Sequence, residues 1–154
     1  MSDQFDAIVI GAGQSGPFLA ARLAGENKKV ALIEREHVGG TCVNDGCTPT
    51  KTLVASARAA WMARRAGDFG VTVKGPVSVD MKAVKARKDA VVGASVESLT
   101  EWLGGIEALE YIEGEGRFLS PSEVQIGERT ITAPQIFINT GARAAVPDWP
   151  GIDK

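Results

Sequence analysis

Four short segments rich in apolar residues are spaced along the chain and have the lengths of buried strands. They cover residues 7–10, 30–33, 109–112 and 136–139. Apolar runs of this kind are typical of a parallel sheet that is covered on both faces. The pattern therefore predicts an α/β fold with a central parallel sheet.

Three longer segments carry apolar residues at three- and four-residue steps, which indicates helices that pack along one face. They cover residues 17–23, closed by Gly25, then residues 50–66, and a segment that begins after Asp80 and ends at Gly104. Asp80 is a favourable N-cap, and glycine is a favourable stop. The expected packing positions are Phe18, Leu19 and Leu23 in the first helix, Leu53, Val54, Ala57, Ala60 and Trp61 in the second, and Met81, Val84, Val91, Val92, Leu99, Trp102 and Leu103 in the third.

Near the C-terminal end, short alternating segments are separated by turn residues. Residues 118–119, 123–126 and 129–132 have this character, which predicts a small antiparallel β meander. We expect residues 114–118 to break the chain between the strand at 109–112 and the meander. Residues 71–73 form a short strand at most.

Length and composition set the class of protein. The 154 residues are enough for one domain with its own core, and 44% hydrophobic with 23% charged residues is an ordinary globular composition. A net charge of -2 argues against nucleic acid as a partner. The chain has no apolar run of membrane-spanning length and no signal-peptide pattern at its start. We therefore expect a cytoplasmic protein that does not bind membranes.

A glycine-rich turn lies between the first predicted strand and the first predicted helix. It reads Gly11-Ala12-Gly13-Gln14-Ser15-Gly16, and Glu34 ends the next strand 18 residues later. This order is the context that the dinucleotide-binding fingerprint requires. Gly11 permits the tight turn, Gly13 lets a pyrophosphate approach the helix N-terminus, and Gly16 lets helix and strand pack closely. Glu34 would bind a ribose hydroxyl and repel a 2′-phosphate, which favours FAD or NAD over NADP.

Both cysteines lie in one stretch, at positions 42 and 47. In a regular helix their Cα atoms would be roughly 8–9 Å apart, which exceeds the ~7 Å limit for a disulfide. If Cys42 and Cys47 pair, the backbone between them is therefore not regular helix. Residues 44–46 tolerate a turn, and Pro49 suits the first turn of a helix that begins near Cys47. A helix N-terminus lowers the pKa of a nearby thiol, so the stretch favours exchange chemistry.

Together these motifs resemble those of the pyridine nucleotide-disulfide oxidoreductases, the family of glutathione reductase, dihydrolipoamide dehydrogenase and mercuric reductase. The similar motifs are the glycine turn, Glu34, residues 39–51, residues 114–118 and residues 140–142, in the order found in the family. The resemblance covers essentially the whole chain and implies the N-terminal part of a Rossmann-like FAD-binding domain. Residues 48–57 resemble mercuric-reductase-like members most, with dihydrolipoamide dehydrogenase-like members also similar.

The resemblance implies roles for individual residues. Cys47 corresponds to the flavin-proximal sulfur, Cys42 to the interchange thiol that attacks the substrate, and Lys51 to the lysine beside the flavin ring. The implied FAD contacts are Gly11, Gly13, Gln14, Ser15 and Gly16 around the pyrophosphate, Glu34 and Gly116 at the adenosine end, Gly40, Thr41 and Lys51 near the flavin, and Thr140 with Gly141. Asp45 replaces a usual aliphatic residue, so its charge is expected to raise a thiol pKa.

We expect residues 1–145 to form the FAD-binding domain and residues 146–154 to form a linker toward an NAD(P)-binding domain that this chain lacks. The family's homodimer-forming domain and its catalytic histidine are also expected to be missing, because His37 matches no catalytic position. Enzymes of this kind pass electrons from NAD(P)H through FAD and a disulfide to a small-molecule disulfide or mercuric ion. The chain alone would then be incomplete and inactive.

Three alternatives remain open at this point. The glycine turn could be purely structural, with Glu34 solvated. The chain could be a non-catalytic module that binds FAD, or only its ADP part, and uses the two cysteines as a redox switch. His37, Cys42 and Cys47 could bind a metal, although their spacing matches no standard zinc pattern, and we predict no metal site.

Overall fold

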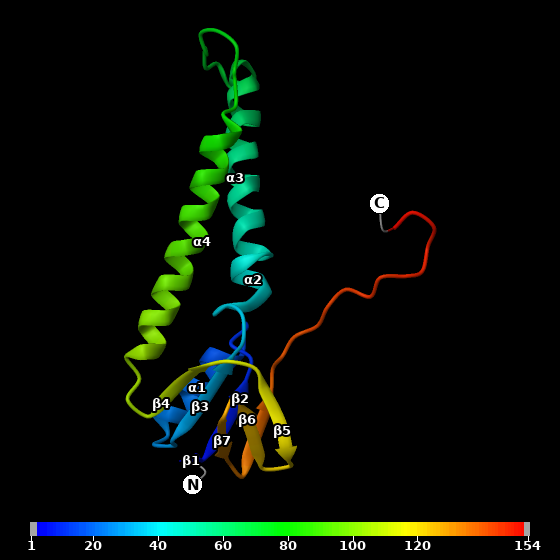
Figure 1. Cartoon of the computed structure of the whole chain (residues 1–154). Helices are drawn as coiled ribbons and strands as arrows, with labels where there is room; N and C mark the ends of the chain where they lie inside the picture. Colours follow the sequence, from blue (N-terminus) through cyan, green and yellow to red (C-terminus); the bar gives the residue numbers. More distant parts are fainter. Residues whose placement is uncertain (1–2, 153–154) are drawn as a thin grey trace.

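The computed structural model describes residues 3–152, so the outermost residues of the predicted domain and linker, 1–2 and 153–154, lie outside it. Figure 1 shows two small sheets at one end and a long helical hairpin projecting from them. The elements in chain order are β1 (Asp3–Gln4), β2 (Ala7–Ile10), α1 (Gly16–Gly25), β3 (Val30–Glu34), α2 (Gly40–Asn44), α3 (Cys47–Arg64), a 3₁₀ helix (Ala66–Phe69), α4 (Met81–Gly104), β4 (Leu109–Glu113), β5 (Gly116–Ser120), β6 (Glu123–Ile126), β7 (Arg129–Thr132) and β8 (Gln135–Ile138).

The central sheet has the strand order β4-β3-β2-β8, and every neighbouring pair is parallel. All four residues of β2 are buried, as are the first four of β3. The predicted α/β class with a central parallel sheet is confirmed. Because the strands are parallel, their carboxyl ends meet at one edge of the sheet, where ligands bind in folds of this kind.

The second sheet has the order β1-β7-β6-β5. Strands β5, β6 and β7 form the predicted antiparallel meander. Strand β1 adds to β7 in parallel, which the sequence did not predict, so this sheet is mixed. The predicted break over residues 114–118 is too long, because β5 already begins at Gly116, where an added Cβ atom would meet the side chains of Val124, Ile33 and Ile10.

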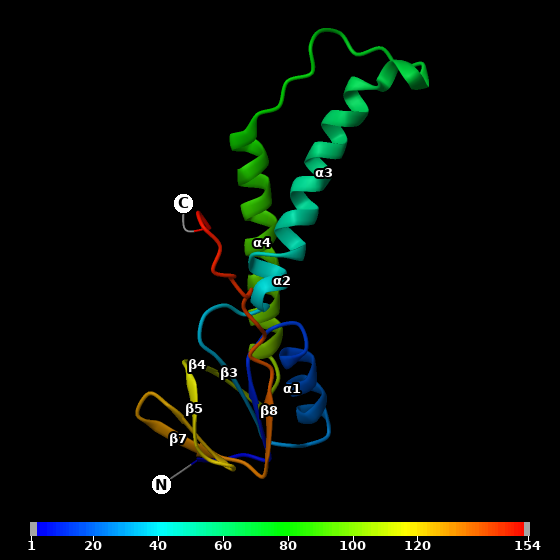
Figure 2. The same ribbon diagram turned by 90° about the vertical axis from the view of Figure 1, so that its right-hand side faces the viewer.

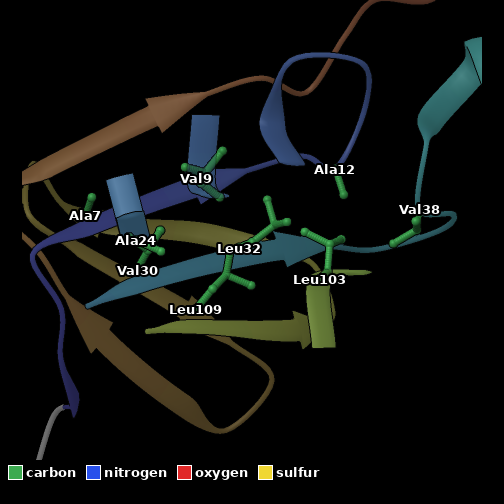
Figure 3. Close-up of a cluster of buried hydrophobic side chains, with 10 residues drawn as sticks. Ala7, Val9, Ala12, Ala24, Val30, Leu32, Val38, Leu103 and Leu109 are labelled. Carbon is green, nitrogen blue, oxygen red and sulfur yellow. The ribbon is translucent and has the colours of Figure 1, made fainter. Parts of the chain in front are cut away.

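The two faces of the central sheet bury different clusters, because successive side chains of a strand point to opposite faces. Ala7, Val9, Val30 and Leu32 face α1 and the end of α4, as the side chains in Figure 3 show. The alternate residues of β2 and β3 face the second sheet and form a separate cluster with residues of that sheet. The strand residues are Ile8, Ile10, Ala31 and Ile33, and the others are Phe5, Val124, Ile126, Ile131 and Ala133.

Helices α3 and α4 pack against each other and extend away from both sheets (Figures 1 and 2). Asp80 caps α4 as predicted, accepting hydrogen bonds from the backbone N–H groups of Lys82 and Ala83. The predicted packing stripe of α3 is mostly exposed, including Trp61. The stripe of α4 is confirmed in part, because Leu103 is buried and Val84, Val92 and Leu99 are half-buried, whereas Met81, Val91 and Trp102 are exposed. A helix in a two-helix arm has only one neighbour to cover its apolar positions. Residues 71–73 form no strand.

No helix within residues 3–152 is long and apolar enough to cross a membrane.

Arg129 on β7 connects the two sheets. Its guanidinium donates hydrogen bonds to Asp3 of β1 and to Glu110 of β4, in the central sheet. The hydrogen bond to Glu110, together with that to Asp3, raises the pKa of Arg129 above its ordinary value. All three side chains are about one-third to one-half exposed, so water screens the cluster.

We expect Arg129→Ala to lower the free energy of unfolding by about 1 kcal/mol, because one substitution leaves two carboxylates without their shared partner. Urea denaturation measures this change. Arg22→Ala is the matched control, since Arg22 forms a single exposed pair with Glu26 on α1, and its effect should stay within about 0.5 kcal/mol. Equal effects of the two substitutions would show that Arg129 does not connect the sheets.

Candidate functional site

A cavity of about 430 Å³ opens at the carboxyl edge of the central sheet. Each of the four parallel strands contributes the segment that follows it, which is the arrangement expected for a ligand site in this fold. The lining residues are Ile10, Gly11 and Gly13 from β2 and its turn, Ile33 to His37 from β3, Gly114 to Gly116 after β4, Asn139 to Arg143 after β8, and Gly40, Thr41 and Asp45 from the cysteine stretch.

The glycine turn packs tightly everywhere except at its middle glycine. Gly11 has a φ of +105°, and a Cβ atom there would lie 2.2 Å from the backbone oxygen of Asn139. A Cβ atom on Gly16 would lie 2.0 Å from the backbone oxygen of Gly11. On Gly13 a Cβ atom would meet nothing within 4 Å. Gly11 and Gly16 are therefore required by packing, whereas Gly13 leaves open space beside the cavity.

Glu34 is held at the cavity by the backbone. One carboxylate oxygen accepts a hydrogen bond from the N–H of Ala12 and the other from the N–H of Glu36, both at 2.8 Å. Each carboxylate oxygen can accept a further bond. The side chain is therefore fixed in orientation and still able to bind a hydroxyl group of a ligand.

Asn139 was not identified from the sequence, although it organises the same turn. Its side-chain N–H donates to the Gly11 oxygen at 3.3 Å, and its side-chain oxygen accepts from the Ser15 hydroxyl at 2.7 Å. It therefore links the end of β8 to both ends of the glycine turn. The available signal was a polar residue closing an apolar strand immediately before Thr140 and Gly141.

The cysteine stretch lies directly against the glycine turn. The N–H of Gly39 donates to the Ala12 oxygen at 2.8 Å, and the Gln14 side chain donates to the Gly39 oxygen at 3.4 Å. A Cβ atom on Gly40, which has a φ of +56°, would lie 2.8 Å from the Gly13 α-carbon. Two motifs 27 positions apart in the chain are thus in backbone contact.

The two thiols sit on either side of a break between two helices. Cys42 lies within α2, which the sequence did not predict, and Cys47 is the first residue of α3. Asp45 and Gly46 separate the helices, so the backbone between the thiols is not regular helix, which is the condition that the sequence sets for a Cys42–Cys47 disulfide. Both thiols are free in the structure, and their pairing as a disulfide stays a prediction.

Neighbouring groups shift the pKa of the Cys42 thiol in opposite directions. Interaction with the Cys47 side chain, followed by burial, raises the pKa of the Cys42 thiol. The backbone N–H of Cys47 and the ammonium group of Lys51 act in the opposite direction and lower it. Asp45, whose charge was expected to raise a thiol pKa, is not among the causes for Cys42, where the increase comes from Cys47 and from burial.

The structure brings together many, though not all, of the predicted site residues at the cavity wall. Those that line it are Gly11, Gly13, Glu34, Gly40, Thr41, Gly116, Thr140 and Gly141. The others do not line it: Gln14, Ser15 and Gly16 belong to the glycine turn, Cys42 lies on α2, and Cys47 and Lys51 lie on α3. Within residues 3–152 no three His, Cys, Asp or Glu side chains are grouped so that they could hold a metal ion.

The fold and site define a Rossmann-like α/β domain with two thiols beside the carboxyl edge of its parallel sheet. The sequence profile of the family described as pyridine nucleotide-disulphide oxidoreductase matches residues 5–154. The chain belongs to this family, in agreement with the resemblance found in the sequence.

Individual relatives agree with this assignment. Dihydrolipoyl dehydrogenase of Acholeplasma laidlawii is 35% identical over 154 residues, covering 100% of this chain and 46% of that protein. Mercuric reductase of Bacillus cereus is 34% identical over 151 residues, covering 97% of this chain and 24% of that protein. The solved structure of the HOCl-induced flavoprotein disulfide reductase RclA from Escherichia coli matches with a TM-score of 0.80 at 33% identity, covering 97% of this chain and 31% of that one. The chain thus spans less than half the length of these relatives.

The glycine turn gives a matched pair of substitutions. We expect Gly13→Ala to leave the free energy of unfolding unchanged within about 0.5 kcal/mol and to weaken FAD binding tenfold or more, because the added methyl enters space that only a ligand would fill. Gly16→Ala should lower the free energy of unfolding by about 2 kcal/mol, because its methyl collides with the Gly11 oxygen. Urea denaturation and isothermal titration calorimetry separate the two effects. A stable Gly16→Ala variant, or unchanged binding by Gly13→Ala, would contradict these assignments.

The groups around Cys42 give a second pair. Cys47→Ala should lower the pKa of Cys42, because it removes the interaction that raises that pKa. Lys51→Gln should raise it further, because a nearby positive charge favours the thiolate. The pH dependence of iodoacetamide alkylation, followed on the Cys42 peptide of the reduced protein, reports both shifts. Shifts in the same direction would disprove the assignment.

Proposed function

We propose that this chain is the N-terminal FAD-binding part of a flavin-dependent reductase in which Cys42 and Cys47 form a redox-active disulfide. The observation that carries this proposal is the backbone contact between Gly13 and Gly40. It places the thiol-bearing helices against the turn where a dinucleotide pyrophosphate would bind. If the glycine turn served only to connect β2 to α1, the contact between Gly13 and Gly40 would not be needed.

The residues at the cavity fit an adenine dinucleotide. Gly13 leaves space at the N-terminus of α1, where backbone N–H groups and the helix dipole favour a pyrophosphate. The fixed carboxylate of Glu34 suits a ribose hydroxyl, and Gly116, Thr140 and Gly141 form the walls beside it. When bound, FAD supplies the two-electron carrier between a nicotinamide and the disulfide.

The exchange step belongs to the two cysteines. In the reduced protein, the Cys42 thiolate attacks one sulfur of a substrate disulfide, forms a mixed disulfide and releases one thiol. The Cys47 thiolate then attacks the Cys42 sulfur, which releases the second thiol and leaves the Cys42–Cys47 disulfide. Interaction with Cys47 and burial raise the pKa of the Cys42 thiol, and the Lys51 ammonium opposes this increase and so favours the attacking thiolate.

This order of the two thiols follows the family resemblance. Cys47 is the more exposed of the two cysteine residues in the structure, so residue exposure alone favours the opposite order. Single-cysteine variants therefore decide which thiol attacks the substrate and which lies against the flavin.

We propose that the activity of the whole protein needs residues outside this chain. We propose that residues 1–145 are the FAD-binding domain and residues 146–154 lead toward the rest of a longer enzyme. Nicotinamide binding, the catalytic histidine and homodimer contacts would belong to that remainder. The dihydrolipoyl group and the mercuric ion, which the names of the relatives contain, are candidate substrates for such an enzyme, as is another small-molecule disulfide.

The test is the absorption spectrum of the purified chain after addition of FAD. We expect a yellow protein that retains flavin through gel filtration. Cys42→Ser should keep the flavin and show a long-wavelength charge-transfer band from the remaining Cys47 thiolate, whereas Cys47→Ser should keep the flavin and lack that band.

Two results would contradict the proposal in different ways. A band in Cys47→Ser and none in Cys42→Ser would reverse the roles of the thiols. A colourless protein that takes up no FAD would refute cofactor binding by this chain.

A further inference from the structure

Four charged side chains with no role in the exchange chemistry stand around one end of the cavity. Arg35 and Glu36 follow β3, Glu115 lies between β4 and β5, and Arg143 belongs to the extended segment after β8. All four line the cavity. They come from three separate segments and carry two positive and two negative charges.

These side chains form a continuous chain of ion pairs. A guanidinium nitrogen of Arg143 lies 3.1 and 3.3 Å from the two carboxylate oxygens of Glu36. Glu36 also faces the Arg35 side chain at 3.4 Å, and Arg35 reaches Glu115 at 3.5 Å. One exposed pair would contribute little, but Glu36 is shared between two guanidinium groups, and pairs within a network contribute more than isolated pairs.

The position of the network follows from Glu34. The Glu34 carboxylate accepts the Glu36 backbone N–H, so Glu36 is fixed next to the group that we assign to the ribose. The Arg143–Glu36 pair therefore joins two segments of the cavity wall, near the group that we assign to the adenosine end.

Arg143 is also where the segment after β8 is attached to the domain. Among the side chains of the described residues 140–152, Arg143 is the one that hydrogen-bonds to another part of the chain, through its ion pair with Glu36. The rest of this segment runs outward with exposed side chains (Figure 1). Breaking the pair would free the cavity wall formed by residues 140–143.

We propose that the Arg143–Glu36 pair is a latch that holds residues 140–143 over the adenosine end of the cavity and slows release of an adenine dinucleotide. The latch rests on the proposed binding of FAD. It makes Arg143 and Glu36 positioning residues for retention of the dinucleotide, with no part in thiol exchange.

Charge reversal tests the latch. Arg143→Glu should release FAD roughly two- to fivefold faster than the wild type at low ionic strength, the range expected for one exposed pair in a network. The double variant Arg143→Glu with Glu36→Arg has the net charge of the wild type and should restore slow release. Release is followed by the rise in flavin fluorescence after dilution. Arg22→Glu is the control, since its partner Glu26 lies on α1 outside the cavity lining.

A second readout does not depend on flavin. In the protein without FAD, Arg143→Glu should speed amide hydrogen exchange in residues 140–145, and the double variant should restore the wild-type rate. The outcomes then separate the two proposals. Unchanged exchange and release in Arg143→Glu overturn the latch alone, as does a double variant that fails to restore them. A wild-type chain that takes up no FAD overturns the proposed function and the retention role together.

Discussion

The close approach of Gly40 to Gly13 is the constraint on which the site depends. No residue with a side chain fits at position 40, because its Cβ atom would lie 2.8 Å from the Gly13 α-carbon. The hydrogen bond from the Gly39 N–H to the Ala12 oxygen fixes the same contact. As a result, α2, which carries Cys42, starts beside the glycine turn, and α3 begins at Cys47 after the break at Asp45 and Gly46. The glycine turn and the cysteine stretch are therefore adjacent in the fold.

The central sheet makes this contact possible. Because β2 and β3 are buried on both faces, their positions are set by two separate apolar clusters, one under α1 and one under the second sheet. Their carboxyl ends then lie at fixed positions. The backbone N–H of Gly11 donates to the Ile33 oxygen and that of Asn139 to the Ile10 oxygen, so the first residues after β2 and β8 are also held in place. Two backbone N–H groups donate hydrogen bonds to the Glu34 carboxylate, which fixes an acceptor for a polar ligand at this edge of the sheet.

The parts that the sequence predicted well are those governed by local patterns. The apolar run of β2, the glycine turn and the Asp80 cap each follow from a few neighbouring residues. Strand β1 was missed because its two exposed residues show no alternation of apolar and polar side chains. Helix α2 was missed because its five residues begin with glycine and show no apolar repeat at three- and four-residue steps. The exposure of α3 and α4 could not be predicted, since a stripe of apolar residues does not reveal how many neighbours a helix has. Asn139 and the Arg143–Glu36 pair depend on contacts between residues more than 100 positions apart, which no local pattern encodes.

The central claim is that a flavin and the Cys42–Cys47 disulfide exchange electrons within this chain. Anaerobic titration of the FAD-loaded protein with dithionite measures it directly, by counting the electrons needed for full reduction. Flavin and disulfide each take two electrons, so the account predicts four per bound FAD in the wild type and two in Cys42→Ser. An uptake of two electrons by both proteins, with the wild-type flavin fully reduced, would contradict it.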